Sequence, residues 1–281
     1  MLFLLFFAVF LVLWGVLYAA LPVLRHAGGR AAHAAAALSM RYPHVKRLAA
    51  HAGRFRDYLP VALILAVGAV LTAWTGDGFL DIAELVHAKS PLLQQMDANV
   101  HAWAASRRSA DATLFFGLMS TLGGPGGVAA ILGLVGVALV VARRWRWLVY
   151  LAVTAGGGGL LDLELKRYFA RARPELAEAL RQAHGYSFPS GHAMGSTVAF
   201  FALSYLAFRF FTAWRWKAAS LALATTFVLS VALSRVYLGV HWISDVGAGI
   251  VAGLLWVTAT TVAYETSRRV RLLRALRAKR S

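Results

Sequence analysis

Long apolar runs separated by short polar segments dominate the chain. A helix needs about 20 apolar residues to cross a hydrocarbon core of roughly 30 Å. Seven runs come near or above this length, at about 2–24, 58–75, 113–142, 146–165, 192–211, 217–236 and 243–264. The pattern predicts an all-α integral membrane protein with seven candidate spans, and it leaves no room for a large soluble domain.

Local breaks in this pattern add detail. The third run contains TLGGPGG (121–127), and because glycine and proline weaken a helix, we expect a short interfacial helix there, followed by a span from about residue 125. The stretch 76–111 is polar and acidic, which predicts a periplasmic cap. Four consecutive glycines (156–159) and the pair Gly249 and Gly253 lie inside spans with no preceding strand, so we expect close helix packing there rather than a phosphate-binding loop.

The charged residues indicate how the chain crosses the membrane. Of the 281 residues, 59% are hydrophobic and 15% are charged, and the formal net charge is +17. Such a charge suggests nucleic acid for a soluble protein, but in a membrane protein the division of Lys and Arg between the two sides explains it without a nucleic-acid partner. Most of the 29 basic residues follow the first, third, fifth and seventh runs. By the positive-inside rule, the C-terminus is cytoplasmic and the N-terminus lies outside.

These features predict four segments. The first run lacks a basic leader and a small-residue cleavage pattern, so we expect an uncleaved, extra N-terminal transmembrane helix over 1–24. A basic cytoplasmic linker or surface helix (25–57) precedes a six-helix core (58–264). A basic cytoplasmic tail (265–281) follows, which we expect to touch anionic lipid headgroups.

Three polar clusters fall on the predicted non-cytoplasmic side. They are KRYFARARP (166–174), PSGH (189–192) and SRVYLGVHWISD (234–245). The chain has no cysteine, which leaves His, Ser, Asp and Glu for any chemistry. Phosphoryl transfer needs positive charge around the equatorial oxygens, and Lys166, Arg173 and Arg235 can supply it without a metal. Each of them alone would be read as an ordinary headgroup anchor.

The other two motifs add groups that bind an anion and transfer protons. Ser190 and Gly191 begin a helix, where free N–H groups and the helix dipole favour a phosphate; helix capping alone explains Pro189 and Ser190, but it does not require His192, which suits a general acid. His241 and Asp245 are four residues apart, so on one helix face the carboxylate can hold one ring nitrogen and leave the other as a nucleophile. Nearby cations disfavour a metal there, and we expect none.

Together, K-x6-R-P, P-S-G-H and S-R-x5-H-x3-D resemble the type 2 phosphatidic acid phosphatase (PAP2) superfamily, over about residues 58–264. Its membrane members are lipid phosphatases, and its soluble relatives include bacterial acid phosphatases and vanadium haloperoxidases. One departure is Ala172, where many members carry Pro. The resemblance implies a six-helix PAP2-like core that works without a cofactor.

The resemblance also implies a role for each matching residue. His241 would attack phosphorus to form a phosphohistidine, Asp245 would orient it, and His192 would protonate the leaving oxygen and then activate water. The phosphate would be held by Lys166, Arg173, Ser190, Gly191 and Arg235. Arg167 and Arg171 match no family position and are predicted to be interface residues. Asp162 and Glu164 lie near enough in sequence to pair with Lys166 or other cations.

The predicted function is hydrolysis of a lipid mono- or diphosphate at the periplasmic face of a bacterial-type inner membrane. Phosphatidate, phosphatidylglycerol phosphate and undecaprenyl diphosphate are candidate substrates. A phosphotransferase that passes the group to an acceptor such as lipid A would use the same phosphoenzyme. A vanadate haloperoxidase uses similar residues, although seven spans argue against it. A non-catalytic lipid transporter needs headgroup-binding charges but not the two histidines and the aspartate. The sequence leaves the oligomeric state open.

Overall fold

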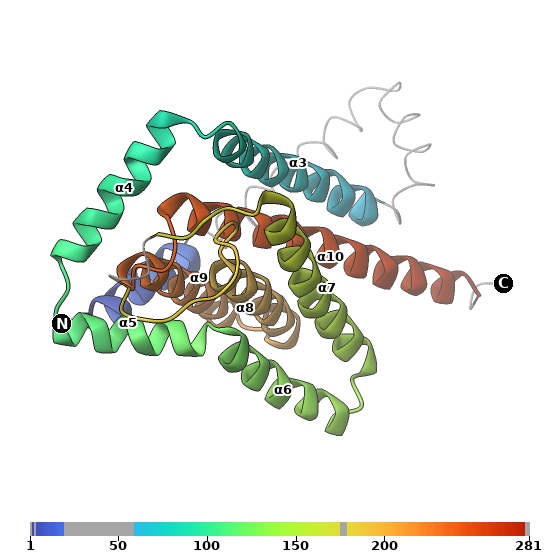
Figure 1. The fold of residues 1–281 in the computed structure, drawn as a ribbon. Helices are drawn as coiled ribbons and strands as arrows, with labels where there is room; N and C mark the ends of the chain where they lie inside the picture. The colour runs from blue at the N-terminus through green and yellow to red at the C-terminus, as the bar shows by residue number, and fades with distance from the viewer. Residues whose placement is uncertain (1, 3, 20–58, 175–178, 279–281) are drawn as a thin grey trace, which may run out of the picture.

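The computed structural model describes residues 2, 4–19, 59–174 and 179–278, and these ranges contain helices and connecting loops only (Figure 1). After an N-terminal helix, Leu4–Ala19, the helices are α3 (Leu59–His87), α4 (Pro91–Ser106), α5 (Ala110–Leu122), α6 (Pro125–Val141), α7 (Trp145–Phe169), α8 (Gly191–Phe210), α9 (Trp214–Tyr237) and α10 (Ile243–Ala278). The all-α prediction is therefore confirmed.

Five of the helices are long and apolar enough to cross a membrane. They are α3, α7, α8, α9 and α10, and the bent pair α5 and α6 passes the same test as one unit, which gives up to six spans in the described ranges. The axes of α5 and α6 meet at 53°. Pro125 is the first residue of α6, where its missing N–H costs nothing. The break therefore lies in the glycine- and proline-rich stretch where the sequence predicts one.

Helix α8 forms the centre of the bundle. It packs against α10, α9 and α7, and α10 in turn packs along α3. Half of the residues in the most apolar stretch of α8 are buried inside the protein. In α3 the corresponding share is 17%, because α3 lies at the edge of the bundle. The predicted close packing is confirmed for Gly157, Gly158, Gly249 and Gly253, and a Cβ at Gly253 would lie 2.7 Å from Thr197 Cβ on α8. It does not hold for Gly156 and Gly159, where an added Cβ would have nothing within 4 Å.

Two helices extend beyond the spans that the sequence predicts. Helix α3 continues to His87, because Thr75, Phe79 and Ala83 recur at every fourth residue and keep one face buried. The predicted cap over 76–111 is thus divided between the end of α3, the separate helix α4, which contacts α9 and α10, and the start of α5. Helix α10 runs to Ala278 and so includes residues 265–278 of the predicted basic tail.

The N-terminal helix packs against α5 and the start of α9. Phe6 lies 6.4 Å from the ring of Phe115 in α5, and the indole N–H of Trp14 donates to the carbonyl of Arg215 at 3.0 Å. Leu2 packs near Tyr237, at the other end of α9. The described part of this helix therefore runs antiparallel to α9, while the predicted linker over 25–57 lies outside the described residues.

Candidate active site

The three polar clusters converge at one end of the bundle. The end of α7, the start of α8, the end of α9 and the start of α10 all meet there, and the described parts of the connecting loop, 170–174 and 179–190, lie over them (Figure 1). Each cluster lies on a helix end because its polar residues follow or precede an apolar span. The sequence predicts this shared location from the alternation of the spans.

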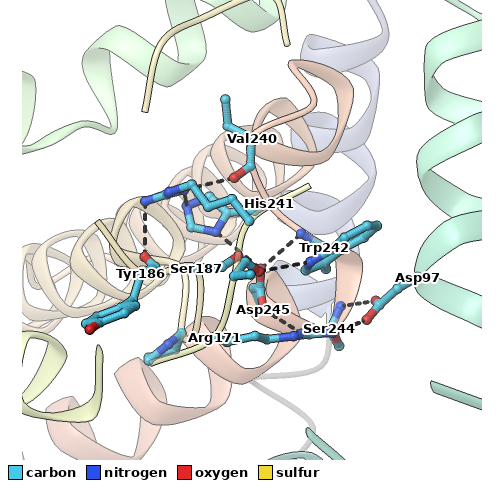
Figure 2. Close-up of polar contacts among 12 residues, drawn as sticks. Asp97, Arg171, Tyr186, Ser187, Val240, His241, Trp242, Ser244 and Asp245 are labelled. Carbon is cyan, nitrogen blue, oxygen red and sulfur yellow. Dashed lines mark hydrogen bonds and ion pairs between the residues drawn. The ribbon is translucent and has the colours of Figure 1, made fainter. Parts of the chain in front are cut away.

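His241 and Asp245 lie at the junction of α9 and α10. Gly239, with φ of 76°, turns the chain after α9 and brings His241 under the start of α10. Asp245 is fully buried, and its Oδ2 lies 3.4 Å from Nδ1 of His241. The same oxygen accepts hydrogen bonds from the backbone N–H of Trp242, at 3.0 Å, and from the hydroxyl of Ser187 (Figure 2). The carboxylate is therefore fixed by several donors besides the histidine.

The other ring nitrogen of His241 faces Arg173. Nη1 of Arg173 lies 3.0 Å from Nε2 of His241 and donates to the carbonyl of Val240 at 2.8 Å. Its remaining donors bind the carbonyls of 184–186 at 3.0 to 3.1 Å. Since a guanidinium can only donate, Nε2 is an acceptor here, which assigns the ring proton to Nδ1, facing Asp245. An unprotonated Nε2 beside a fixed cation is the arrangement that a nucleophile toward phosphate requires.

Burial sets the protonation of both groups. Loss of solvent lowers the pKa of His241 to about 4, with the positive charges of Arg173 and Arg235 adding to this effect and Asp245 opposing it. Burial also lowers the pKa of Arg173 from its usual value, while Asp245 counteracts the shift. The imidazole of His241 is consequently neutral at pH 7.

The start of α8 provides the backbone donors and the second histidine. The N–H of Ser190 donates to the carbonyl of Asp245 at 2.9 Å, which ties α8 to α10. The hydroxyl of Ser190 is buried and has no hydrogen-bond partner among the described residues. His192 lies within electrostatic range of Arg235, His241 and Arg173. The break between α5 and α6 approaches it, because a Cβ at Gly124 would lie 2.9 Å from Nε2 of His192.

Lys166 lies beside the same helix start. Its ammonium forms an ion pair with Asp162 at 2.7 Å and donates to the carbonyl of Pro189. A Cβ at Gly191 would lie 2.8 Å from Oδ2 of Asp162 and 3.3 Å from Nζ of Lys166, so a larger residue at 191 would displace this pair. Asp162 is therefore the partner of Lys166, one of the options that the sequence leaves open.

Arg235 completes the set of cations. Only 4% of the residue is exposed, Nη1 donates to the hydroxyl of Ser120 in α5, and Nε has no hydrogen-bond partner in the described part of the chain. All eight predicted site residues are thus gathered at one end of the bundle. Within the described residues, no group of three or more His, Asp or Glu side chains is arranged to hold a metal ion.

Arg171 is the main correction to the sequence prediction, which treats it as an interface residue. Its side chain is 16% exposed and binds two carboxylates, Asp245 through Nη1 and Asp97 through Nη2, each at 2.7 Å. Asp97, on α4, also accepts from the N–H and hydroxyl of Ser244 at 3.0 and 2.7 Å (Figure 2). Arg167, by contrast, forms an exposed pair with Glu164 at 2.9 Å.

One sequence signal could have identified Asp97. It lies four residues after Leu93 in α4, and both side chains are buried, so a carboxylate occupies the apolar face of an amphipathic helix. A buried carboxylate requires a partner, and a basic one is the strongest candidate. Ser187 and Ser120 carry no such signal, because serine is common in loops and spans.

Comparison with known proteins finds one matching family model and several similar proteins. Residues 145–269 match the PAP2 superfamily model. Over 183 residues the chain is 29% identical to phosphatidylglycerophosphatase B of Bacillus subtilis, covering 63% of this chain and 86% of that protein. It is 33% identical over 130 residues to decaprenylphosphoryl-5-phosphoribose phosphatase of Mycobacterium tuberculosis, covering 44% of this chain and 64% of that protein.

A solved structure supports the same conclusion. The crystal structure of a transmembrane PAP2-type phosphatidylglycerolphosphate phosphatase from Bacillus subtilis superposes with a TM-score of 0.60 at 25% identity, over 66% of this chain and 94% of that one. The fold and these matches define a multi-span, PAP2-type membrane phosphatase. Over residues 145–269 the chain is therefore similar to the PAP2 superfamily.

Proposed function

We propose that this protein removes a phosphate from a lipid at the periplasmic face of the inner membrane, through a phosphohistidine on His241. The observation that carries the proposal is the buried His241–Asp245 pair, whose outward ring nitrogen lies 3.0 Å from the guanidinium of Arg173. A buried, neutral imidazole with a fixed carboxylate behind it and a cation in front is suited to attack on phosphorus.

The reaction takes two steps. Nε2 of His241 attacks phosphorus, the bond to the lipid oxygen breaks, and His192 donates a proton to that oxygen. His192 then takes a proton from water as the water attacks the phosphohistidine, which releases inorganic phosphate and restores His241. Charge on the equatorial oxygens is stabilised by Lys166, Arg173 and Arg235, and by the N–H groups at the start of α8.

Asp97 and Arg171 act as positioning residues in this proposal. Asp245 must keep one orientation while the charge of His241 changes, and Arg171 holds its second oxygen. Asp97 in turn fixes Arg171 and satisfies the N–H of Ser244 in the first turn of α10. Helix α4 therefore secures the carboxylate from outside the membrane-spanning core.

The substrate class follows from the relatives and the site. Both relatives' names describe a lipid whose headgroup carries a phosphate. We propose such headgroup phosphates as substrates, because the cation cluster lies at the ends of the spans, where a lipid headgroup resides. The extra anchor over 1–24 and the cytoplasmic placement of 25–57 and of the tail belong to the same proposal, since the positive-inside rule puts the active site outside.

Phosphate release by the purified protein tests the proposal. Phosphatidylglycerol phosphate, phosphatidate and undecaprenyl diphosphate are compared for the wild type, His241→Ala and His192→Ala. We expect both variants to lose activity, and robust release from either one contradicts the mechanism. With p-nitrophenyl phosphate, whose leaving group needs little protonation, His192→Ala should accumulate an acid-labile phosphoenzyme, and His241→Ala should form none. Adding an acceptor lipid and analysing the products distinguishes hydrolysis from phosphotransfer.

A further inference from the structure

A second concave site lies at the opposite end of the bundle. A groove of about 430 Å³ runs between the first half of α7 and the second half of α10. Trp145, Val149 and Val153 form its apolar wall on α7 and are each at least 56% exposed. The wall on α10 includes Thr260 and Ala263. Because these side chains belong to helices that cross the membrane, the wall faces lipid chains rather than water.

The two sites lie at different membrane interfaces. Arg146 lines the groove and Lys166 belongs to the active site, and 20 residues of α7 separate them. At 1.5 Å per residue this separation is about 30 Å, which equals the thickness of a typical hydrocarbon core. The groove is therefore outside the active site.

The polar end of the groove is positively charged. Arg146 from α7 and Arg271 from α10 both lie within electrostatic range of Tyr264, and Ser267 lines the same end. Neither arginine forms an ion pair with any residue that the structure describes. The neighbouring arginines differ, because Arg268 and Arg269 both bind Glu265, at 2.5 and 3.2 Å. Two cations thus remain available beside an apolar wall.

We propose that this groove binds one anionic phospholipid of the leaflet opposite the active site. The headgroup phosphate lies between Arg146 and Arg271 and accepts hydrogen bonds from the two guanidinium groups, while an acyl chain follows Val149 and Val153. A soluble anion would satisfy the two charges but would leave the apolar wall unused. The combination of two unpaired arginines and a lipid-facing wall is what selects a phospholipid.

Lipid retention during native mass spectrometry tests this proposal. The probes are phosphatidylglycerol, a phosphodiester, and phosphatidylcholine with the same acyl chains, each added to protein in detergent. We expect the wild type to retain phosphatidylglycerol preferentially. Arg146→Gln/Arg271→Gln should weaken this preference by roughly fivefold per arginine, about 25-fold in total. Phosphatidylglycerol bound near the active site is common to all variants, so the difference between variants reports on the groove.

Two controls separate the groove from general charge. Arg209→Gln/Arg274→Gln removes the same charge from exposed positions outside the groove and should leave the preference unchanged. Ala263→Phe keeps both arginines but fills the groove, and it should reduce retention of phosphatidylglycerol. If the double glutamine variant unfolds, this filling variant provides the test. The proposal is overturned by an unchanged preference in Arg146→Gln/Arg271→Gln or Ala263→Phe, by an equal loss in the control, or by glycerol phosphate displacing the lipid at equal concentration.

Discussion

Truncation of Asp97 is the sharpest test of the network behind the proposed nucleophile. The carboxylate is 2% exposed and accepts three hydrogen bonds, from Arg171 and from the N–H and hydroxyl of Ser244. Asp97→Ala leaves Arg171 with one carboxylate instead of two and removes the partner of a backbone N–H in the first turn of α10. The protein therefore loses both a charge partner and a helix cap.

The magnitude follows from burial. Removing one partner of a buried ion pair costs about 3–5 kcal/mol, and losing a helix cap costs about 1 kcal/mol. Arg171 keeps Asp245 as a partner and is 16% exposed, which limits the effect. We expect Asp97→Ala to lower the free energy of unfolding by about 3 kcal/mol, a large part of the 5–15 kcal/mol typical of a folded domain.

Unfolding in detergent micelles, followed by tryptophan fluorescence, measures this change. The matched control is Asp81→Ala, because Asp81 is exposed on α3 and should change stability by no more than about 0.5 kcal/mol. In the folded fraction, Asp97→Ala should lower kcat with little change in KM, since the proposed role is to orient Asp245 rather than to bind substrate. Arg171→Lys should do the same, because an ammonium cannot bridge two carboxylates as a planar guanidinium does.

Two results would refute this reasoning. If Asp97→Ala is as stable as Asp81→Ala, the network adds nothing to the fold. If its folded fraction retains wild-type kcat, Asp97 has no positioning role, even if stability falls.

Three further predictions concern the site and its orientation. The pKa of His241 is about 4, and His241 must be neutral to attack phosphorus. After correction for substrate ionisation, kcat/KM should therefore fall only below about pH 4. A fall that begins near pH 6.5 would contradict the effect of burial on this pKa. Gly191→Ala should reduce kcat/KM by roughly five- to 150-fold, which corresponds to the cost of overpacking, about 1–3 kcal/mol, because its Cβ would lie 2.8 Å from Oδ2 of Asp162. Gly195→Ala, with nothing within 4 Å of the added Cβ, is the neutral control. The chain has no cysteine, so a membrane-impermeant maleimide on intact cells should label Ala88→Cys but not Ala213→Cys, and the reverse pattern would place the active site on the cytoplasmic side.

The spans and the site residues follow from sequence patterns that act locally. A run of about 20 apolar residues predicts a span wherever it occurs. His241 and Asp245 are related by helical spacing, and PSGH lies at the start of an apolar helix. Because alternate loops lie on the same side of a membrane, knowing the spans is enough to place the three motifs at one membrane face. Their convergence on one site also depends on the packing of α8 against α7, α9 and α10, which the spans alone do not determine.

The length of α3 was harder to predict, because its last turns are amphipathic rather than uniformly apolar. Residues 76–87 include Asp77, Asp81 and Glu84, which read as a polar cap in a hydropathy pattern. Phe79 and Ala83 nevertheless keep their spacing and pack with residues of α10 and the site loop. A helix of 29 residues is about 44 Å long at 1.5 Å per residue, so α3 crosses the core and continues beyond it.

The role of Arg171 could not come from spacing, because both of its partners are distant in sequence. It lies 74 residues from Asp97 and 74 from Asp245, and the three side chains meet only after α4 folds against α10. Arg173 is a second arginine in the same motif, and the sequence does not show which of the two binds the carboxylate. In the structure the guanidinium of Arg173 points toward His241 and the carbonyls of residues 184–186. Two arginines separated by one residue thus face opposite ends of the same His–Asp pair: Arg173 lies beside the proposed nucleophilic nitrogen and Arg171 behind the carboxylate.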